Sequence, residues 1–182
     1  MQNTSSNKIK EPFFRKFYNR LLRLHNYLKE LSPVKFVLFM TLSTYLSIVV
    51  FLPLFLISWK TEGFVDAGPF QSEHSIIVLF IFAIIIAPIL ETLVYQSFII
   101  SLCKQFKFLN KKIIIIFISA LAFSLSHTYS LSYIFNTLFI GMILAYAYLV
   151  YEDKHQSSYW IVCSIHALRN SLSLLLSILI QN

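Results

Sequence analysis

Five long apolar runs constrain this chain more than any other feature of its sequence. A helix needs about 20 mostly apolar residues to cross the hydrocarbon core of a bilayer, where its backbone groups must all be hydrogen-bonded internally. The runs cover residues 36–59, 76–102, 112–127, 131–151 and 159–180. The third is short, because the polar sequence HTYSLS follows at its end, and we count it as a span. The sequence therefore predicts an all-α fold, a polytopic transmembrane helical bundle with about five spans.

Charge divides the chain into two parts. Hydrophobic residues make up 57% of the sequence, too many for a soluble domain of this length, whereas residues 1–35 are basic. In that segment five apolar residues recur at helical spacing: Phe14, Phe17, Leu21, Leu24 and Leu28. The pattern predicts a cytoplasmic basic amphipathic arm (1–35) on an anionic membrane surface, or a solvated helix that only orients the protein, followed by a membrane domain (36–182). A nucleic-acid partner is not expected, since the basic charge adjoins a membrane segment and no aromatic recognition motif accompanies it.

Lysines also predict the orientation of the spans. Lys104, Lys107, Lys111 and Lys112 lie between the second and third runs. Because basic loops remain on the cytoplasmic side, this loop and the N-terminus are both expected there. The predicted location is the cell membrane, with multiple spans and membrane lipid as surroundings.

Few polar residues interrupt the spans, and each should face the bundle interior because burying it in lipid costs several kcal/mol. They are Glu91, Gln96, His127, Asn136, His166, Arg169 and Asn170. His166 and Asn170 are four residues apart and so share one helix face. The same spacing relates Phe123 to His127.

A glutamate, two histidines and an asparagine suit amide hydrolysis. A carboxylate and an imidazole that face one water can make it a nucleophile, and a second histidine and an amide can stabilise the oxyanion that forms. Glu91, His127 and His166 also match a two-histidine, one-carboxylate zinc site. Since no HExxH motif is present, we favour a reaction without a metal, and zinc stays an alternative.

Three motifs in order resemble the CPBP (CAAX protease and bacteriocin-processing, or Abi) family of intramembrane endopeptidases. They are APILETLVYQSF around Glu91, FSLSH ending at His127, and HALRN from His166 to Asn170, and the similarity covers about residues 76–180. The resemblance implies a glutamate-type hydrolase without cofactors that cleaves a peptide or protein substrate at the membrane. It assigns water activation to Glu91 and His127, and oxyanion stabilisation to His166 and Asn170.

The first motif departs from the family pattern at two positions. Thr92 replaces a second glutamate and Gln96 replaces an arginine, so the ion pair that these positions form in the family is absent. We expect Thr92 and Gln96 to support the site through a neutral hydrogen bond instead. Arg169 is a candidate to replace the missing arginine electrostatically.

Other functions fit parts of the same pattern. An equal alternative for Glu91 is a buried ion pair with Arg169 that only fixes packing, and an alternative for His166 and Asn170 is to join helices by hydrogen bonds. The main prediction is an intramembrane endopeptidase, with bacteriocin processing or self-immunity as one possible role. The alternative is a non-catalytic relative that acts as a bacteriocin-immunity or membrane scaffold protein. A proton-relay transport subunit is disfavoured, because the chain shows no inverted halves.

Overall fold

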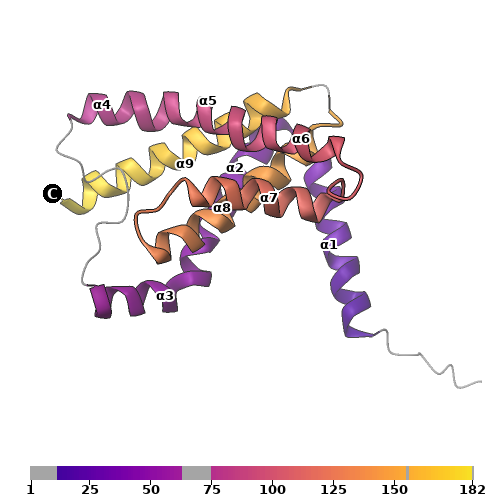
Figure 1. Ribbon diagram of the computed structural model, residues 1–182, viewed down its shortest axis with the longest axis horizontal. Coiled ribbons are helices and arrows are strands. Elements are labelled where there is room, and N and C mark those ends of the chain that lie inside the picture. Colours follow the sequence, from indigo (N-terminus) through magenta and orange to yellow (C-terminus); the bar gives the residue numbers. More distant parts are fainter. Residues whose placement is uncertain (1–11, 63–74, 155, 182) are drawn as a thin grey trace, which may run out of the picture. The chain divides into compact units, whose positions relative to one another are not determined.

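The computed structural model consists of two units, Met1–Ser32 and Pro33–Asn182. It describes residues 12–62, 75–154 and 156–181, and every regular element in those ranges is a helix. The predicted all-α polytopic bundle is therefore confirmed (Figure 1).

The described part of the first unit, residues 12–32, contains one amphipathic helix, α1 (Phe13–Glu30). Its apolar side chains recur at helical spacing, and most of them are exposed, including Phe13, Phe14 and Phe17. The helix begins after Pro12 and ends at Leu31, whose backbone is extended. Pro33 then disfavours helical backbone at the residue before it, so the chain starts a new helix there.

Four helical segments of the second unit are long and apolar enough to cross a membrane: Pro33–Ile57, Ile76–Gln105, Leu131–Tyr151 and Ser158–Leu179. The apolar helix α7 (Lys112–Leu125) has 14 residues, so the third predicted span is the short one, as its sequence indicates. The chain is thus a multi-pass membrane protein.

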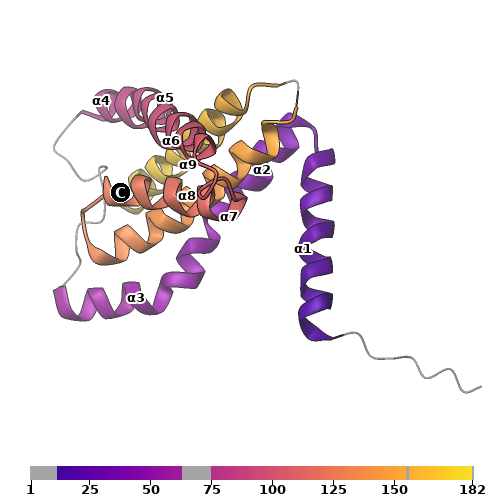
Figure 2. The same cartoon turned by 45° about the vertical axis from the view of Figure 1, so that its right-hand side comes forward.

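The first span is broken at Tyr45, which the sequence did not predict. It consists of α2 (Pro33–Thr44) and α3 (Leu46–Glu62), which point in different directions in both views (Figures 1 and 2). Hydroxyl groups bond back to the chain here: Thr44 Oγ1 donates to the Thr41 carbonyl at 2.6 Å, and Ser47 Oγ donates to the Thr44 carbonyl at 2.7 Å. Such bonds compete with regular helical hydrogen bonds and bend helices.

The second span is one continuous helix that contains two wider π-helical segments. Its parts are α4 (Ile76–Phe80), η2 (Ile81–Ile86), α5 (Ala87–Glu91), η3 (Thr92–Phe98) and α6 (Ile99–Gln105). In both views α9 (Ser158–Gln181) runs alongside this helix in the opposite direction (Figures 1 and 2). Glu91 ends α5, directly before the second π segment. π segments occur frequently at functional sites.

The central helix of the second unit is α8 (Leu131–Tyr151). In its apolar stretch 56% of the residues are buried, whereas in that of Ile76–Gln105 only 17% are. It packs tightly on α7 because Gly141 has no side chain: a Cβ there would lie 2.9 Å from Cα of Ala120. This close approach places the end of α7, and with it His127, against the bundle interior.

Candidate functional site

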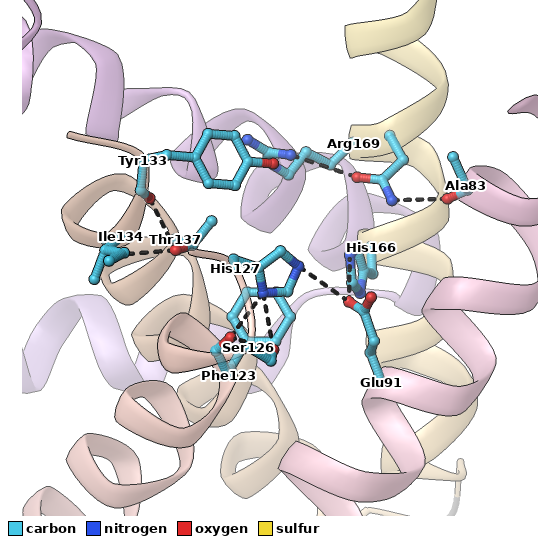
Figure 3. A network of polar contacts seen from close by, with 11 residues as sticks. Ala83, Glu91, Phe123, Ser126, His127, Tyr133, Ile134, Thr137, His166 and Arg169 are labelled. Carbon is cyan, nitrogen blue, oxygen red and sulfur yellow. Dashed lines mark hydrogen bonds and ion pairs between the residues drawn. The ribbon is translucent and has the colours of Figure 1, made fainter. Parts of the chain in front are cut away.

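Three predicted site residues meet where three helices converge. Glu91 comes from α5, His166 from α9, and His127 follows directly after α7. One carboxylate oxygen of Glu91, Oε2, lies 3.6 Å from Nε2 of His166 and 3.8 Å from Nε2 of His127 (Figure 3). The structure thus brings together side chains that are up to 75 positions apart in the sequence.

Phe123 orients His127 through both its backbone and its ring. Nδ1 of His127 lies 2.7 Å from the Phe123 carbonyl oxygen and 3.0 Å from Oγ of Ser126. Since a carbonyl only accepts, Nδ1 carries the proton and donates, which leaves Nε2 as an acceptor directed at Glu91. The Phe123 ring also contacts both imidazoles, with centroids 4.5 Å from His127 and 5.7 Å from His166. The FxxxH spacing therefore fixes one histidine and packs against the other.

The distances between Glu91 and the two histidines are longer than direct hydrogen bonds, which span about 2.7–3.2 Å. A gap of this size between polar groups is suited to a bridging water. The arrangement therefore allows the Glu91 carboxylate and Nε2 of His127 to act on one water molecule placed between them.

Asn170 is held by a backbone carbonyl on the helix of Glu91. Its Nδ2 donates to the Ala83 carbonyl oxygen at 2.7 Å (Figure 3). In η2 the N–H of Ala87 donates to Phe82, five residues earlier, and the next residue in this register, Pro88, has no N–H to donate to Ala83. The AP pair in the first motif thus frees the carbonyl that Asn170 binds. Nδ2 carries a second hydrogen, which remains for another acceptor.

Two residues that sequence reasoning missed bind the same helix. Tyr159 donates its hydroxyl to the Ile89 carbonyl at 3.0 Å, and Sγ of Cys163 lies 3.5 Å from the Pro88 carbonyl oxygen. With His166 and Asn170 they recur at intervals of four, three and four residues, which places all four on one face of α9. That spacing is the sequence signal that identifies them as neighbours of His166 and Asn170.

Thr92 and Gln96 are fully buried, and the predicted hydrogen bond between them is absent. Oγ1 of Thr92 and both amide atoms of Gln96 have no hydrogen-bond partner in the part of the chain that the structure describes. This prediction was wrong because both residues belong to η3, where the wider helix alters the spacing that an α-helix gives to residues four apart.

A cavity of about 950 Å³ opens beside Glu91. One wall is apolar and comes from the helix of Glu91, with Val78, Leu79, Phe82, Ile86 and Leu90. The lining also includes aromatic residues, among them Tyr129 and Tyr133, and the polar residues Glu91, Arg169, Asn170 and the two histidines. Asn136, by contrast, is buried outside this lining.

Arg169 lines the cavity without pairing with Glu91. His127 and His166 are the ion-pair partners that lie within 4.0 Å of the Glu91 carboxylate among the described residues. The ion pair between Glu91 and Arg169 that the sequence left open is therefore not formed. Arg169 and Gln96 make no hydrogen bond with each other among the described residues. Both amide atoms of Gln96 lack a partner, and NH1 of Arg169 donates to Oδ1 of Asn170 at 3.4 Å.

The described residues contain no group of three or more histidine, cysteine or acidic side chains placed to hold a metal ion. The Glu91 oxygen lies 3.6 and 3.8 Å from the two imidazole nitrogens, beyond the range of a direct hydrogen bond.

Comparison with known families matches residues 73–172 to a family described as type II CAAX prenyl endopeptidase Rce1-like. The match covers more than half of the 182 residues and includes Glu91, His127, His166 and Asn170, which confirms the resemblance that the three motifs carry. No match was found among curated proteins or among solved structures. Membership implies intramembrane protease activity in general terms. The chain belongs to the Rce1-like family of CAAX-protease-like membrane proteins.

Proposed function

We propose that the protein is an intramembrane endopeptidase that uses Glu91 and His127 to activate water. The observation that carries this proposal is the position of Oε2 of Glu91, which lies within 4 Å of Nε2 of both histidines in the lining of a mostly apolar cavity. The substrate is a peptide or protein at the membrane, whose apolar side chains are suited to the wall formed by Val78, Phe82 and Leu90.

The reaction follows from the placement of the donors and acceptors. The Glu91 carboxylate, with His127, takes a proton from water, and the oxygen attacks the carbonyl carbon of the scissile peptide bond. The oxyanion is stabilised by His166 and by the second Nδ2 hydrogen of Asn170. When the C–N bond breaks, the proton held by Glu91 passes to the leaving amine, so the carboxylate is restored.

Substitution of Glu91 and His127 tests this proposal. We expect Glu91→Gln and His127→Ala each to lower the rate of peptide processing by about a thousandfold, since general acid–base groups contribute roughly 10² to 10⁴ in rate. Processing is measured with the full chain in detergent micelles and in a host at matched expression. Glu152→Gln is the matched control, because Glu152 pairs with Lys104 away from the cavity lining. Unchanged processing in both site variants would refute the proposal.

A second function is favoured by the unpaired groups beside Glu91. Thr92 and Gln96 leave three buried polar atoms without partners next to the proposed base, so a non-catalytic relative that serves as a bacteriocin-immunity or membrane scaffold protein is the alternative. It predicts that protection of the host survives Glu91→Gln and His127→Ala. The endopeptidase proposal predicts that any such protection is lost with processing.

A further inference from the structure

The side-chain amide of Asn170 lies between two groups that each accept only one orientation of it. Its Nδ2 donates to the Ala83 carbonyl oxygen at 2.7 Å, and its Oδ1 accepts from NH1 of Arg169 at 3.4 Å. The dashed lines in Figure 3 follow this chain from Arg169 to Ala83. A backbone carbonyl only accepts and a guanidinium only donates, so turning the amide over would oppose like groups at both ends. The two contacts therefore fix the orientation of the Asn170 amide.

Arg169 brings a positive charge to this chain that no carboxylate neutralises. The ion pairs of the described residues do not include Arg169, since Glu91 lies against the two histidines instead. In the interior of a protein the dielectric constant is low, and hydrogen bonds in series polarise and strengthen one another. A guanidinium that donates to Oδ1 of Asn170 therefore makes the Nδ2 hydrogens stronger donors than those of an isolated amide.

Tyr45, at the break between α2 and α3, contacts Arg169 at two points. Its hydroxyl donates to the Arg169 carbonyl oxygen at 3.0 Å, and the centroid of its ring lies 6.0 Å from Cζ of Arg169. A guanidinium at about 6 Å from the centre of an aromatic ring is attracted to that ring. The break in the first span thus places a side chain that restricts the position of the guanidinium.

We propose that Arg169 is a positioning residue that holds the Asn170 amide in one orientation and polarises it, so that the free Nδ2 hydrogen is ready for the oxyanion. This inference rests on the proposed function, in which Asn170 donates to that oxyanion. Arg169 acts through Asn170 and does not itself touch the substrate. A dipole that is already oriented needs no reorganisation when the charge develops, which is what makes such donors effective.

The signals of the Asn170 amide report this role without any catalysis. The full chain is labelled with ¹⁵N-asparagine in detergent micelles for nuclear magnetic resonance, and the Asn170 side-chain signals are assigned by their loss in Asn170→Ala. We expect Arg169→Met to move the proton signals of Nδ2 upfield, because the polarising charge is gone. Arg169→Lys, which keeps a charged donor, should move them less. Lys104→Met is the control and should leave them in place, because Lys104 pairs with Glu152 outside the cavity lining.

Kinetics of the same variants then measure what this orientation contributes to the reaction. Arg169→Met should lower kcat for peptide processing by about tenfold with KM unchanged, less than the roughly 10² to 10³ that loss of a whole oxyanion donor costs. Arg169→Lys should recover part of the rate. In the Asn170→Ala background Arg169→Met should not lower kcat further, since the group through which Arg169 acts is absent.

Thermal unfolding in detergent shows whether each variant is folded. Where Arg169→Met is not, Arg169→Gln takes its place in both measurements. Its neutral amide still has an N–H to donate to Oδ1 of Asn170, so the polarising charge alone is lost. The Asn170 signals should again move upfield, by less than in Arg169→Met.

Two results would overturn the inference. One is a set of Asn170 signals that stay in place when the charge of Arg169 is removed. The other is an equally large loss of kcat in the Asn170→Ala background, which would show that Arg169 acts on the reacting group directly. Asn170 signals that shift as expected, in a chain whose processing does not depend on Glu91, would uphold the action of Arg169 on Asn170 and refute the proposed endopeptidase function.

Discussion

Two side chains beside the proposed base carry buried polar atoms without a hydrogen-bond partner in the described part of the chain. Thr92 and Gln96 are 0% exposed, and their hydroxyl and amide groups have no partner among the described residues. A buried polar atom left without a hydrogen bond costs about 1–3 kcal/mol. The two neutral side chains, Thr92 and Gln96, thus leave no unpaired charge in the membrane, but they do not stabilise the bundle.

Thr92→Val should therefore raise the stability of the protein by about 1 kcal/mol, because it removes an unpaired hydroxyl and keeps the shape of the side chain. The midpoint of thermal unfolding in detergent measures the change, and peptide processing should stay within a few-fold of the wild type.

Thr137→Val is the matched control for this substitution. The Thr137 hydroxyl donates to the Tyr133 carbonyl at 2.9 Å and to the Ile134 carbonyl at 3.1 Å, so its loss should not stabilise the protein. A lower unfolding midpoint for Thr92→Val would mean that the hydroxyl has a partner, such as a bound water, that contributes to stability.

At the scale of the helix, the backbone of the second span is as important as its side chains. The π-helical register of η2 and the missing N–H of Pro88 leave the Ala83 carbonyl free for Asn170. Asn170 thus has a structural task in addition to its proposed catalytic one, and the two can be separated by experiment.

A double-mutant cycle on Pro88 and Asn170 isolates the structural task. Asn170→Leu should destabilise the protein by about 1–3 kcal/mol, since it leaves the Ala83 carbonyl without a donor. In the Pro88→Ala background the cost should be smaller, because the new backbone N–H can bond to the same carbonyl. Thermal unfolding in detergent gives both values. An equal cost in the two backgrounds would show that Pro88 does not determine the availability of the carbonyl.

At the scale of the whole molecule, the chain combines a membrane domain with a basic amphipathic helix. The spans expose large apolar side chains such as Leu93, Phe98 and Leu176, which is expected of surfaces that face lipid. Helix α1 differs, because its exposed aromatic residues lie on the same helix as Arg15, Lys16, Arg20 and Arg23. That pattern favours contact with anionic headgroups.

A polarity-sensitive fluorophore at Phe14→Cys, on the apolar side of α1, should emit at shorter wavelength in vesicles with phosphatidylglycerol than in neutral vesicles. The shift should shrink at 1 M salt, where charges are screened beyond about 3 Å. Labelling is selective because Cys103 and Cys163 are buried. Asn26→Cys, on the polar side, is the control, and an equal shift at both positions would contradict a helix that lies on an anionic surface.

The all-α class, the long apolar spans and the polar residues within them could be predicted because they depend on local patterns. Apolar length reveals a span, and a rare polar residue such as Glu91 or His166 within it must face inward. The break at Tyr45, the π segments and the bond from Asn170 to Ala83 could not be predicted. Each depends on which partner meets a backbone group in three dimensions, and α-helical spacing alone misplaces Thr92 and Gln96 relative to one another.

The hydrogen bonds from α9 to the second span bear on which residues near the site can be replaced by others. Tyr159, Cys163 and Asn170 all bind carbonyl oxygens of the main chain on that span. Every residue type supplies such an oxygen, so these contacts do not depend on which side chains the helix carries, apart from Pro88, which leaves the Ala83 carbonyl free. Neighbours of Glu91 can therefore be exchanged, as Thr92 and Gln96 illustrate, while the carboxylate keeps its place between the two histidines.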